Sequence, residues 1–136
     1  MGVGVTVVGV GYLIWGQATR ASIGLPPPAP VSPPAAPAAA AQFLRASERQ
    51  LRMDLAVGAG PAIQDLAAMA EIRPENLPRF GALLREHRSE LITWTDARAL
   101  TPSVAVEVLR RIGEIASRDG ALAEDGRTFR ERHPRT

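Results

Sequence analysis

TPSVAVEVLRRIGEIASRDG, residues 101–120, decides the fold class because it contains the clearest helical signal in the chain. Thr101 followed by Pro102 is typical of an N-cap and the first turn of a helix, and Gly120 matches a C-cap. Apolar residues then recur at the spacing of one helix face. They are Val104, Ala105, Val108, Leu109, Ile112, Ile115 and Ala116. The stretch therefore predicts an amphipathic helix whose apolar face packs against other helices.

Three further apolar faces recur at helical spacing upstream of this stretch, from Gln42 onward. The first comprises Phe43, Leu44, Leu51 and Leu55, the second Ile63, Leu66, Ala67 and Ala70, and the third Leu77, Phe80, Leu84, His87 and Leu91. Pro61 and Pro78 fall in the first turns of the second and third helices, where proline is tolerated. The sequence therefore predicts an all-α fold, a small bundle of about four helices over residues 42–119. After Gly120 apolar residues are few, so residues 120–136 are expected to be a polar, flexible tail.

The N-terminal segment, MGVGVTVVGVGYLIWGQAT, has no charged side chain in its 19 residues. A helix of this length reaches about 28 Å, close to the thickness of a bilayer core. Residues 16–18, Gly-Gln-Ala, have the small-x-small form of a leader cleavage site. Residues 1–20 are therefore expected to be a hydrophobic signal peptide cleaved after Ala18, or a membrane anchor over residues 2–18. Five glycines and the absence of a basic residue before the segment fit neither class well.

The next segment contains GLPPPAPVSPPAAPAAAAQ, which holds seven of the 12 prolines. This Pro/Ala composition cannot build a core and favours extended polyproline II, so residues 21–41 are expected to be a semi-rigid linker. Some 18 residues of it would hold a domain roughly 55 Å from a bilayer. The alternative is a ligand for a proline-binding domain, since Pro27 and Pro30, or Pro30 and Pro33, have the required spacing.

Composition limits the classes of function. All 16 basic residues are Arg, the acids number 14, and the formal net charge is +2, so the strongly basic face of a nucleic-acid binder is missing. There is no cysteine, which excludes disulfides, thiolate metal sites and a Cys nucleophile. The cysteine count fits either cytoplasm or periplasm. Arg20 alone would keep the C-terminal side cytoplasmic, whereas the leader and spacer favour an exported bacterial protein, anchored in the inner membrane or periplasmic.

The corner VGAGPA, residues 57–62, is the one Gly-rich feature within the expected bundle. Backbone amides of Gly58, Ala59 and Gly60 ahead of a helix N-terminus can bind an anion. A phosphate loop needs a lysine at fixed spacing, and the chain contains none. The corner is therefore expected to be a turn in which Gly58 ends one helix with positive φ and Pro61 starts the next. Gly58, Gly60 and Pro61 are predicted to be structural.

No catalytic, metal or cofactor site is predicted from the remaining polar residues. His87 with Glu90 offers too few ligands for a metal, and Ser89, Ser103 and Ser117 lie in no nucleophile motif. Arg110 and Arg111 would add to a cationic patch if their helix packs beside the third one. The alternative is that they pair with Glu107 and Glu114. Trp94 either anchors a partner or completes the core. Trp94, Arg110 and Arg111 are the predicted partner contacts.

Three segments together carry a family resemblance: FLRASERQLRMDLAVGAGPAIQDLAAMAEI, RFGALLREHRSELI and VAVEVLRRI. They resemble the C-terminal helical half of a family of small exported bacterial proteins classed as a domain of unknown function. The matching motif is Asp-x-Ala-x-Gly-x-Gly, here Asp54, Ala56, Gly58 and Gly60, followed by the pair Leu66 and Ala67. The resemblance covers about half of the chain, residues 43–115. It implies export and a helical domain, and it brings no catalytic residues.

These observations favour a non-enzymatic, membrane-tethered or periplasmic helical interaction module. Its partner is expected to be a protein or a second copy of the chain, because a bundle of this size has little core. No nucleic acid, small-molecule substrate or cofactor is expected. The alternative is an accessory single-span subunit of a membrane protein complex, in which residues 2–18 make the contact. A small hydrolase or metal enzyme is a third hypothesis.

Overall fold

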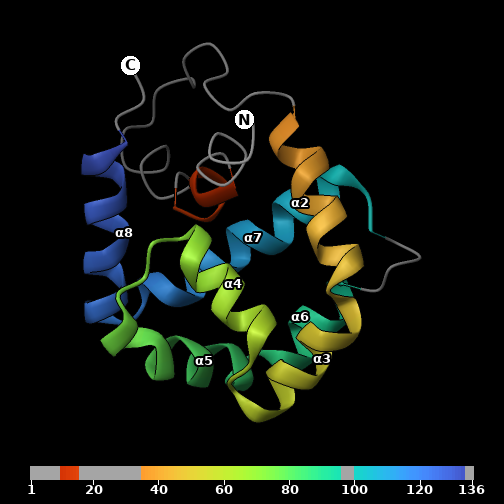
Figure 1. Ribbon diagram of the computed structural model, residues 1–136, viewed down its shortest axis with the longest axis horizontal. Helices are drawn as coiled ribbons and strands as arrows, with labels where there is room; N and C mark the ends of the chain where they lie inside the picture. The colour runs from red at the N-terminus through yellow and green to blue at the C-terminus, as the bar shows by residue number, and fades with distance from the viewer. Residues whose placement is uncertain (1–9, 16–34, 96–99, 134–136) are drawn as a thin grey trace.

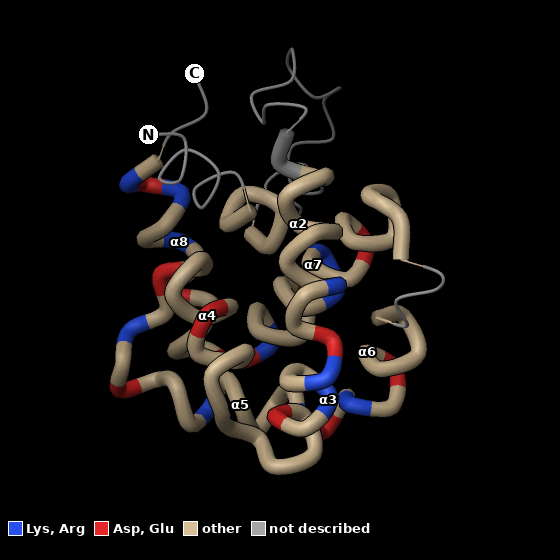
Figure 2. Tube along the Cα trace, turned by 45° about the vertical axis from the view of Figure 1, so that its right-hand side comes forward, with Lys and Arg blue, Asp and Glu red and all other residues tan. Residues whose placement is uncertain are grey.

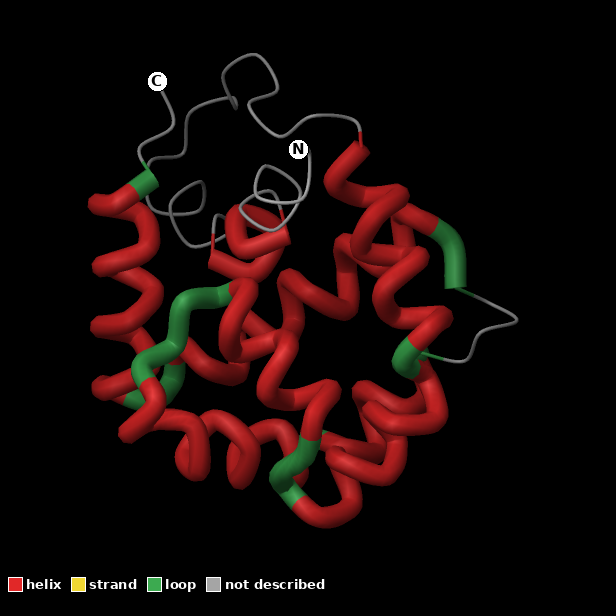
Figure 3. Tube along the Cα trace, viewed as in Figure 1, coloured by secondary structure: helices red, strands yellow, loops and turns green. Residues whose placement is uncertain are grey.

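The computed structural model describes residues 10–15, 35–95 and 100–133, and every regular element in these ranges is helical. A short helix at residues 10–15 is followed by α2 (Ala35–Ala46), α3 (Glu48–Val57), α4 (Pro61–Met69), the 3-10 turn η1 (Pro74–Asn76), α5 (Leu77–Glu86), α6 (Arg88–Trp94), α7 (Pro102–Ser117) and α8 (Gly120–Arg132). Figure 3 shows only short loops between these helices within the described ranges. The predicted all-α class is confirmed, with more and shorter helices than the four expected.

Helix α7 occupies the middle of the molecule, with α8 and α5 on two sides of it and α2 on a third (Figure 1). Its N-terminus forms as the sequence predicts, because the Thr101 hydroxyl accepts a hydrogen bond from the Val104 amide at 3.2 Å. Its apolar face is fully buried. The residues concerned are Ala105, Val108, Leu109, Ile112, Ile115 and Ala116. The helix that decides the fold class is thus also the centre of the core.

The structure differs from the expectation beyond α7. Helix α7 ends at Ser117, and Asp119 caps a new helix by accepting hydrogen bonds from the two amides that follow Gly120. Gly120 therefore opens α8 instead of closing α7. Leu122 and Phe129, seven residues apart, lie on the same side of α8 and are fully buried. The expectation of a flexible tail from residue 120 is thus wrong for the part that α8 occupies, since two well-placed apolar side chains dock the helix.

Two of the expected helices are bent. The first is divided at Ser47 into α2 and α3, and the third is divided at His87 into α5 and α6. At both bends the backbone leaves helical values while the hydrogen bonds continue, for example from the Leu51 amide to the Ser47 carbonyl at 2.7 Å. The bends change the direction of each long apolar stripe, and the buried residues on both sides of each bend belong to the same core.

The helical domain also begins earlier than expected. The sequence predicts a Pro/Ala linker over residues 35–41, but these residues form most of α2, and Ala40 and Ala41 are buried. Pro37 is tolerated because it falls in the first turn of that helix. Alanine is the best helix former and can pack closely against α7, which explains why an alanine run joins the core here. The remainder of the expected linker, residues 21–34, lies outside the described residues.

The short helix at residues 10–15 lies inside the bundle, beside α7 and α8 (red in Figure 1). Val10, Ile14 and Trp15 are each at most 2% exposed. The Trp15 indole N–H donates to the Ala70 carbonyl at 2.8 Å, so its one polar atom is satisfied where it is buried. These residues belong to the expected signal or anchor of residues 1–20, of which residues 1–9 and 16–20 lie outside the described part.

Glycines on α7 and α8 make room for this short helix. A Cβ at Gly113 would collide with the Ile14 carbonyl, and a Cβ at Gly126 would collide with the Trp15 ring. The Arg130 guanidinium donates to the Trp15 carbonyl at 3.3 Å, and the Tyr12 ring packs edge-on against Phe129 at 5.4 Å between centroids. We call the position beside Gly113 and Gly126, which residues 10–15 occupy, the glycine slot.

In the described residues, no helix combines the length and apolarity needed to cross a bilayer.

Candidate functional site: the corner groove

The turn between α3 and α4, residues 58–60, is held by Asp54. Its carboxylate Oδ2 accepts hydrogen bonds from the amides of Ala62 at 2.7 Å and Ile63 at 3.3 Å, at the N-terminus of α4. Its backbone carbonyl accepts from the amides of Gly58 at 2.6 Å and Ala59 at 3.3 Å. The amides of Gly58 and Ala59, two of the three that could have bound an external anion, therefore donate to the chain itself. The predicted turn is observed, and the anion position at the start of α4 is filled by a carboxylate.

Glycine is required in this corner for two reasons. Gly58 has φ of 88° and Gly60 has φ of 143°, which side-chain-bearing residues rarely adopt. A Cβ at Gly60 would also collide with the Asp54 carboxylate, and a Cβ at Gly81 on α5 would collide with the Gly58 carbonyl. The absence of these side chains lets α5 cross directly over the corner. The corner is thus a rigid junction of three helices.

A groove lies between the corner and α5, with a cavity volume of about 320 Å³. Most of its lining is apolar or backbone. Its residues are Val57, Gly58, Ala59 and Gly60 from the corner, Ile63 and Gln64 from α4, and Leu77, Pro78, Ala82 and Arg85 from α5. Because three helices fix its walls, this corner groove is preformed. Its character suits an apolar side chain or a short apolar helix more than a polar metabolite.

Two large apolar side chains lie exposed beside the corner groove. Met53 is 63% exposed and Val57 is 69% exposed, and they lie one turn apart on the outer face of α3. They are the exposed large hydrophobic residues of the described chain. Single exposed apolar residues are ordinary, but two on one helix face, continuous with an apolar groove, mark a contact surface. The sequence pattern did not single out either residue, since exposure on α3 depends on which face α4 and α5 cover.

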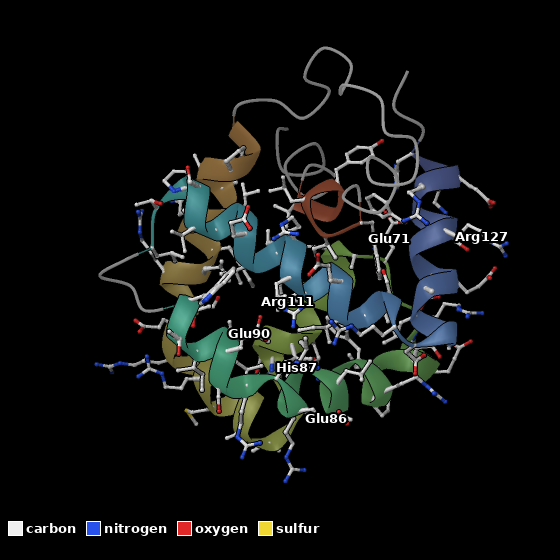
Figure 4. All side chains as sticks on the ribbon, turned by 180° about the vertical axis from the view of Figure 1, so that it is seen from behind. Glu71, Glu86, His87, Glu90, Arg111 and Arg127 are labelled. Carbon is white, nitrogen blue, oxygen red and sulfur yellow. The ribbon has the colours of Figure 1, made fainter. Side chains whose placement is uncertain are left out.

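The predicted partner residues Arg110 and Arg111 lie elsewhere, on α7, and are engaged in ion pairs. Glu90 on α6 meets Arg111 on the face seen in Figure 4. The hydrogen bond from Arg111 lowers the pKa of Glu90 below its ordinary value, and the same contact raises the pKa of Arg111. Arg110 pairs with Glu107 at 2.8 Å. The alternative expected from the sequence, pairing with neighbouring glutamates, is therefore the arrangement observed.

Trp94 and His87 are not brought together with the groove. Trp94 is half-buried at the end of α6 and packs against the core, which agrees with the core-completing interpretation. His87 lies at the bend between α5 and α6, and its Nδ1 is 3.8 Å from Glu90. Among the described residues no group of three or more His, Asp and Glu side chains has the geometry of a metal site.

In the view of Figure 2 charges of the two signs are interspersed over the helices.

Asp125 is a buried carboxylate that the sequence pattern missed. It is 2% exposed, and it accepts hydrogen bonds from the Arg73 guanidinium at 2.7 Å and the Asn76 amide group at 2.8 Å. The contact fastens η1 to α8, and the hydrogen bond to Asp125 raises the pKa of Arg73. Both carboxylate oxygens of Asp125 accept hydrogen bonds from Arg73 or Asn76, at the η1 segment. The role of Asp125 is therefore structural. It leaves the corner groove as the candidate functional site.

No family model, curated protein sequence or solved structure matches this chain. The resemblance of residues 43–115 to the family of small exported bacterial proteins stays a prediction. What the corner groove can bind therefore follows from its own residues.

Proposed function

We propose that this chain is a non-enzymatic helical interaction module whose contact surface is the corner groove with Met53 and Val57. The observation that carries the proposal is the exposure of these two side chains, 63% and 69%, next to an apolar groove. Burying an apolar side chain of this size is worth about 1.5–3 kcal/mol, so a partner that covers both gains substantially. The rigid corner supports this role because a preformed surface loses little entropy on binding.

A site-specific photo-crosslinker tests the proposal in the native cell. The reactive side chain is placed at Ala82, an exposed residue that lines the groove, and in a matched variant at Thr128, an exposed residue of α8. We expect a discrete covalent adduct with a protein from position 82 and none from position 128. Equal labelling from both positions, or none from position 82, would contradict the proposal.

We propose the same groove for a membrane-tethered and for a periplasmic module, because the groove and the glycine slot lie at opposite ends of α4. Trp15, which occupies the glycine slot, donates to the Ala70 carbonyl just after the end of α4. The groove is lined by residues 57–60, which precede the start of α4 at Pro61. Fractionation of membranes followed by intact mass measurement separates the two forms. A soluble species lacking residues 1–18 supports a periplasmic module, and a membrane species that retains them supports a tether.

A second candidate is the accessory single-span subunit, in which residues 2–18 bind within the membrane. Its basis is the uncharged N-terminal sequence. To act in this way the side chains of Val10, Ile14 and Trp15 would leave the core, where they are almost fully buried. A tether through residues 2–18, or cleavage after Ala18, would remove the same side chains from the core, so this burial does not separate the two candidates. Replacing residues 1–18 by an unrelated anchor separates them, since only the second candidate predicts that association with the complex is lost.

A further inference from the structure

Residues 10–15 meet the glycine slot through one side of their short helix (red in Figure 1). Val10 and Ile14 form one pair four residues apart, and Gly11 and Trp15 form the next. All four residues are buried, whereas the two between the pairs are half-buried. Residues four apart lie on the same side of a helix. The segment therefore has a single binding side, made of two aliphatic side chains, a glycine and a tryptophan.

The slot fits this side closely in both directions. On the segment, a Cβ at Gly11 would lie 2.5 Å from the Phe129 ring and 2.6 Å from the Met69 carbonyl oxygen. On the slot, a Cβ at Gly113 would collide with the backbone of the segment, and a Cβ at Gly126 would collide with its tryptophan ring. The slot therefore selects a helix with glycine at one position, which general hydrophobicity does not demand.

The slot also contains an acceptor that needs a donor from the ligand. The Ala70 carbonyl accepts the Trp15 indole N–H at 2.8 Å, and Ala70 is fully buried. The Arg130 guanidinium donates in turn to the Trp15 carbonyl at 3.3 Å. A buried polar group that loses its partner destabilises the complex, so a ligand with apolar side chains alone would bind less well. A tryptophan one turn after the glycine meets both requirements.

The walls of the slot come from a part of the chain that is remote from the segment. The wall contacts described above are made by residues 69–130, and residues 16–34 separate the segment from the start of α2 at Ala35. The same contacts can therefore be made by a helix on another chain. In the intact chain the tethered segment acts at an effective concentration of millimolar order, so a second chain competes only when residues 10–15 have left the slot.

We infer that the glycine slot is a second binding site, independent of the corner groove, which residues 10–15 fill as a built-in ligand. The partner that the slot fits is a protein with an apolar helix that carries the same binding side. This side is an aliphatic residue and a glycine, followed one turn later by an aliphatic residue and a tryptophan. Both predicted fates of residues 1–20 open the site, because cleavage after Ala18 and anchoring over residues 2–18 each take residues 10–15 out of the slot.

Binding of a labelled peptide to the full chain tests the inference. The peptide has the sequence of residues 8–17, and fluorescence anisotropy measures its affinity. Gly11→Arg puts a large charged side chain where even a Cβ collides, so it should expel the segment and free the slot. Thr128→Arg adds the same charge at an exposed position of α8 and leaves the slot filled. We expect the peptide to bind the Gly11→Arg chain about tenfold or more tightly than it binds the Thr128→Arg chain or the wild type.

A second substitution locates the binding. In the Gly11→Arg chain, Gly113→Ala favours helix α7 but places a methyl group where the ligand backbone must lie, so the double variant should lose the peptide. If Gly11→Arg unfolds the chain, the peptide should restore its helical circular dichroism, because a ligand of the folded state stabilises that state. The inference is overturned by equal affinity for the Gly11→Arg and Thr128→Arg chains, by binding that Gly113→Ala leaves unchanged, or by an unfolded variant that the peptide does not restore.

Two variant peptides test the chemistry of the partner helix. The Gly11→Ala peptide is more apolar and a better helix former, yet it should bind about tenfold or more weakly, because its methyl group meets the Phe129 ring. The Trp15→Phe peptide keeps an aromatic ring but has no N–H for the Ala70 carbonyl, so it should bind about fivefold or more weakly. If either variant peptide binds as tightly as the wild-type peptide, the stated chemistry of the partner is wrong.

Discussion

Gly81 is the residue at which packing around the corner is tightest. A Cβ there would meet the Gly58 backbone carbonyl, and neither partner is a flexible side chain that could move aside. We expect Gly81→Ala to lower the free energy of unfolding by about 1–3 kcal/mol, the usual cost of overpacking. Gly120→Ala is the matched control, because no atom lies within 4 Å of the added Cβ and alanine favours α8. Urea denaturation of both variants measures the difference, and equal stabilities would contradict the close approach.

Asp54 is the second residue on which the corner depends. Asp54→Ala leaves the buried amides of Ala62 and Ile63 without an acceptor, so the free energy of unfolding should fall by about 1–3 kcal/mol. Asp54→Asn keeps one side-chain oxygen as an acceptor and should cost less. Thermal and urea unfolding of the two variants give the ranking. An Asn variant as unstable as the Ala variant would show that the hydrogen bonds do not carry the effect.

Individual residues of the corner were predictable to different degrees. Gly58 and Pro61 follow from local chain geometry, and the structure has the positive φ and the first-turn proline that were expected. The requirement for glycine at positions 60 and 81 arises from contacts with Asp54 and with the Gly58 carbonyl. Such contacts depend on how α3, α4 and α5 cross, which a single sequence does not specify. The groove beside them was missed for the same reason.

At the scale of elements, α8 depends on its cap. Asp119 accepts hydrogen bonds from the amides of Ala121 and Leu122 and from the Arg79 guanidinium, and these contacts, chiefly the one from Arg79, lower its pKa below the ordinary value of 3.8. A lowered pKa in the folded state means that the carboxylate stabilises the fold above pH 3.8. This stabilisation is lost as the pH falls through the lower folded value.

Asp119→Ala should therefore cost about 0.5–2 kcal/mol of unfolding free energy at neutral pH, as other lost N-caps do. The difference from the wild type should shrink below the ordinary carboxyl pKa and disappear in stronger acid. Urea denaturation at neutral and acidic pH measures both quantities. Glu124→Ala removes an exposed carboxylate of the same helix and should change stability little at either pH. A cost that is the same at both pH values would rule out the charged cap.

The outcome for α7 and α8 shows which elements a sequence pattern can identify. Helix α7 has seven apolar residues on one face and a matching N-cap, so the spacing of its apolar residues is enough to predict a helix. Helix α8 has two arginines in its last turn and only a sparse apolar stripe. Its docking uses Phe129 and the buried Asp125, whose partners Arg73 and Asn76 lie far away in the sequence. Long-range polar partners leave no periodic signal, which explains why the sequence predicts a tail where the structure has this helix.

For the whole molecule, the glycine slot makes Trp15 part of the core. Trp15→Ala should lower the free energy of unfolding by about 3–5 kcal/mol, because it leaves a cavity and an unpaired Ala70 carbonyl. Trp94→Ala is the control, since Trp94 is only half-buried and its removal should cost less. Denaturant titrations followed by circular dichroism compare them. A Trp15 variant as stable as the wild type would show that residues 10–15 do not occupy the slot.

Hydrophobicity alone could not distinguish the places available to residues 10–15. An uncharged apolar segment satisfies a bilayer and a protein core equally, and the difference lies in the partners that meet it. Those partners are Gly113 and Gly126, which are invisible as a pair in the sequence because they come from different helices. The anchor or signal expected for residues 1–20 was therefore a reasonable inference from composition, and the slot adds a second environment for six of those residues.

The glycine slot also has a consequence for biosynthesis. Residues 10–15 leave the ribosome before the helices that surround them, and the Arg130 that contacts the Trp15 carbonyl follows 115 residues after Trp15. At synthesis rates of about 5–20 residues per second, the apolar segment waits roughly 6–23 s before Arg130 has been synthesised. During that interval Trp15 and Ile14 have no core to enter, and any factor that captures nascent apolar segments meets them first. The order of synthesis thus exposes residues 10–15 to other proteins until α7 and α8 have been made and can bury them.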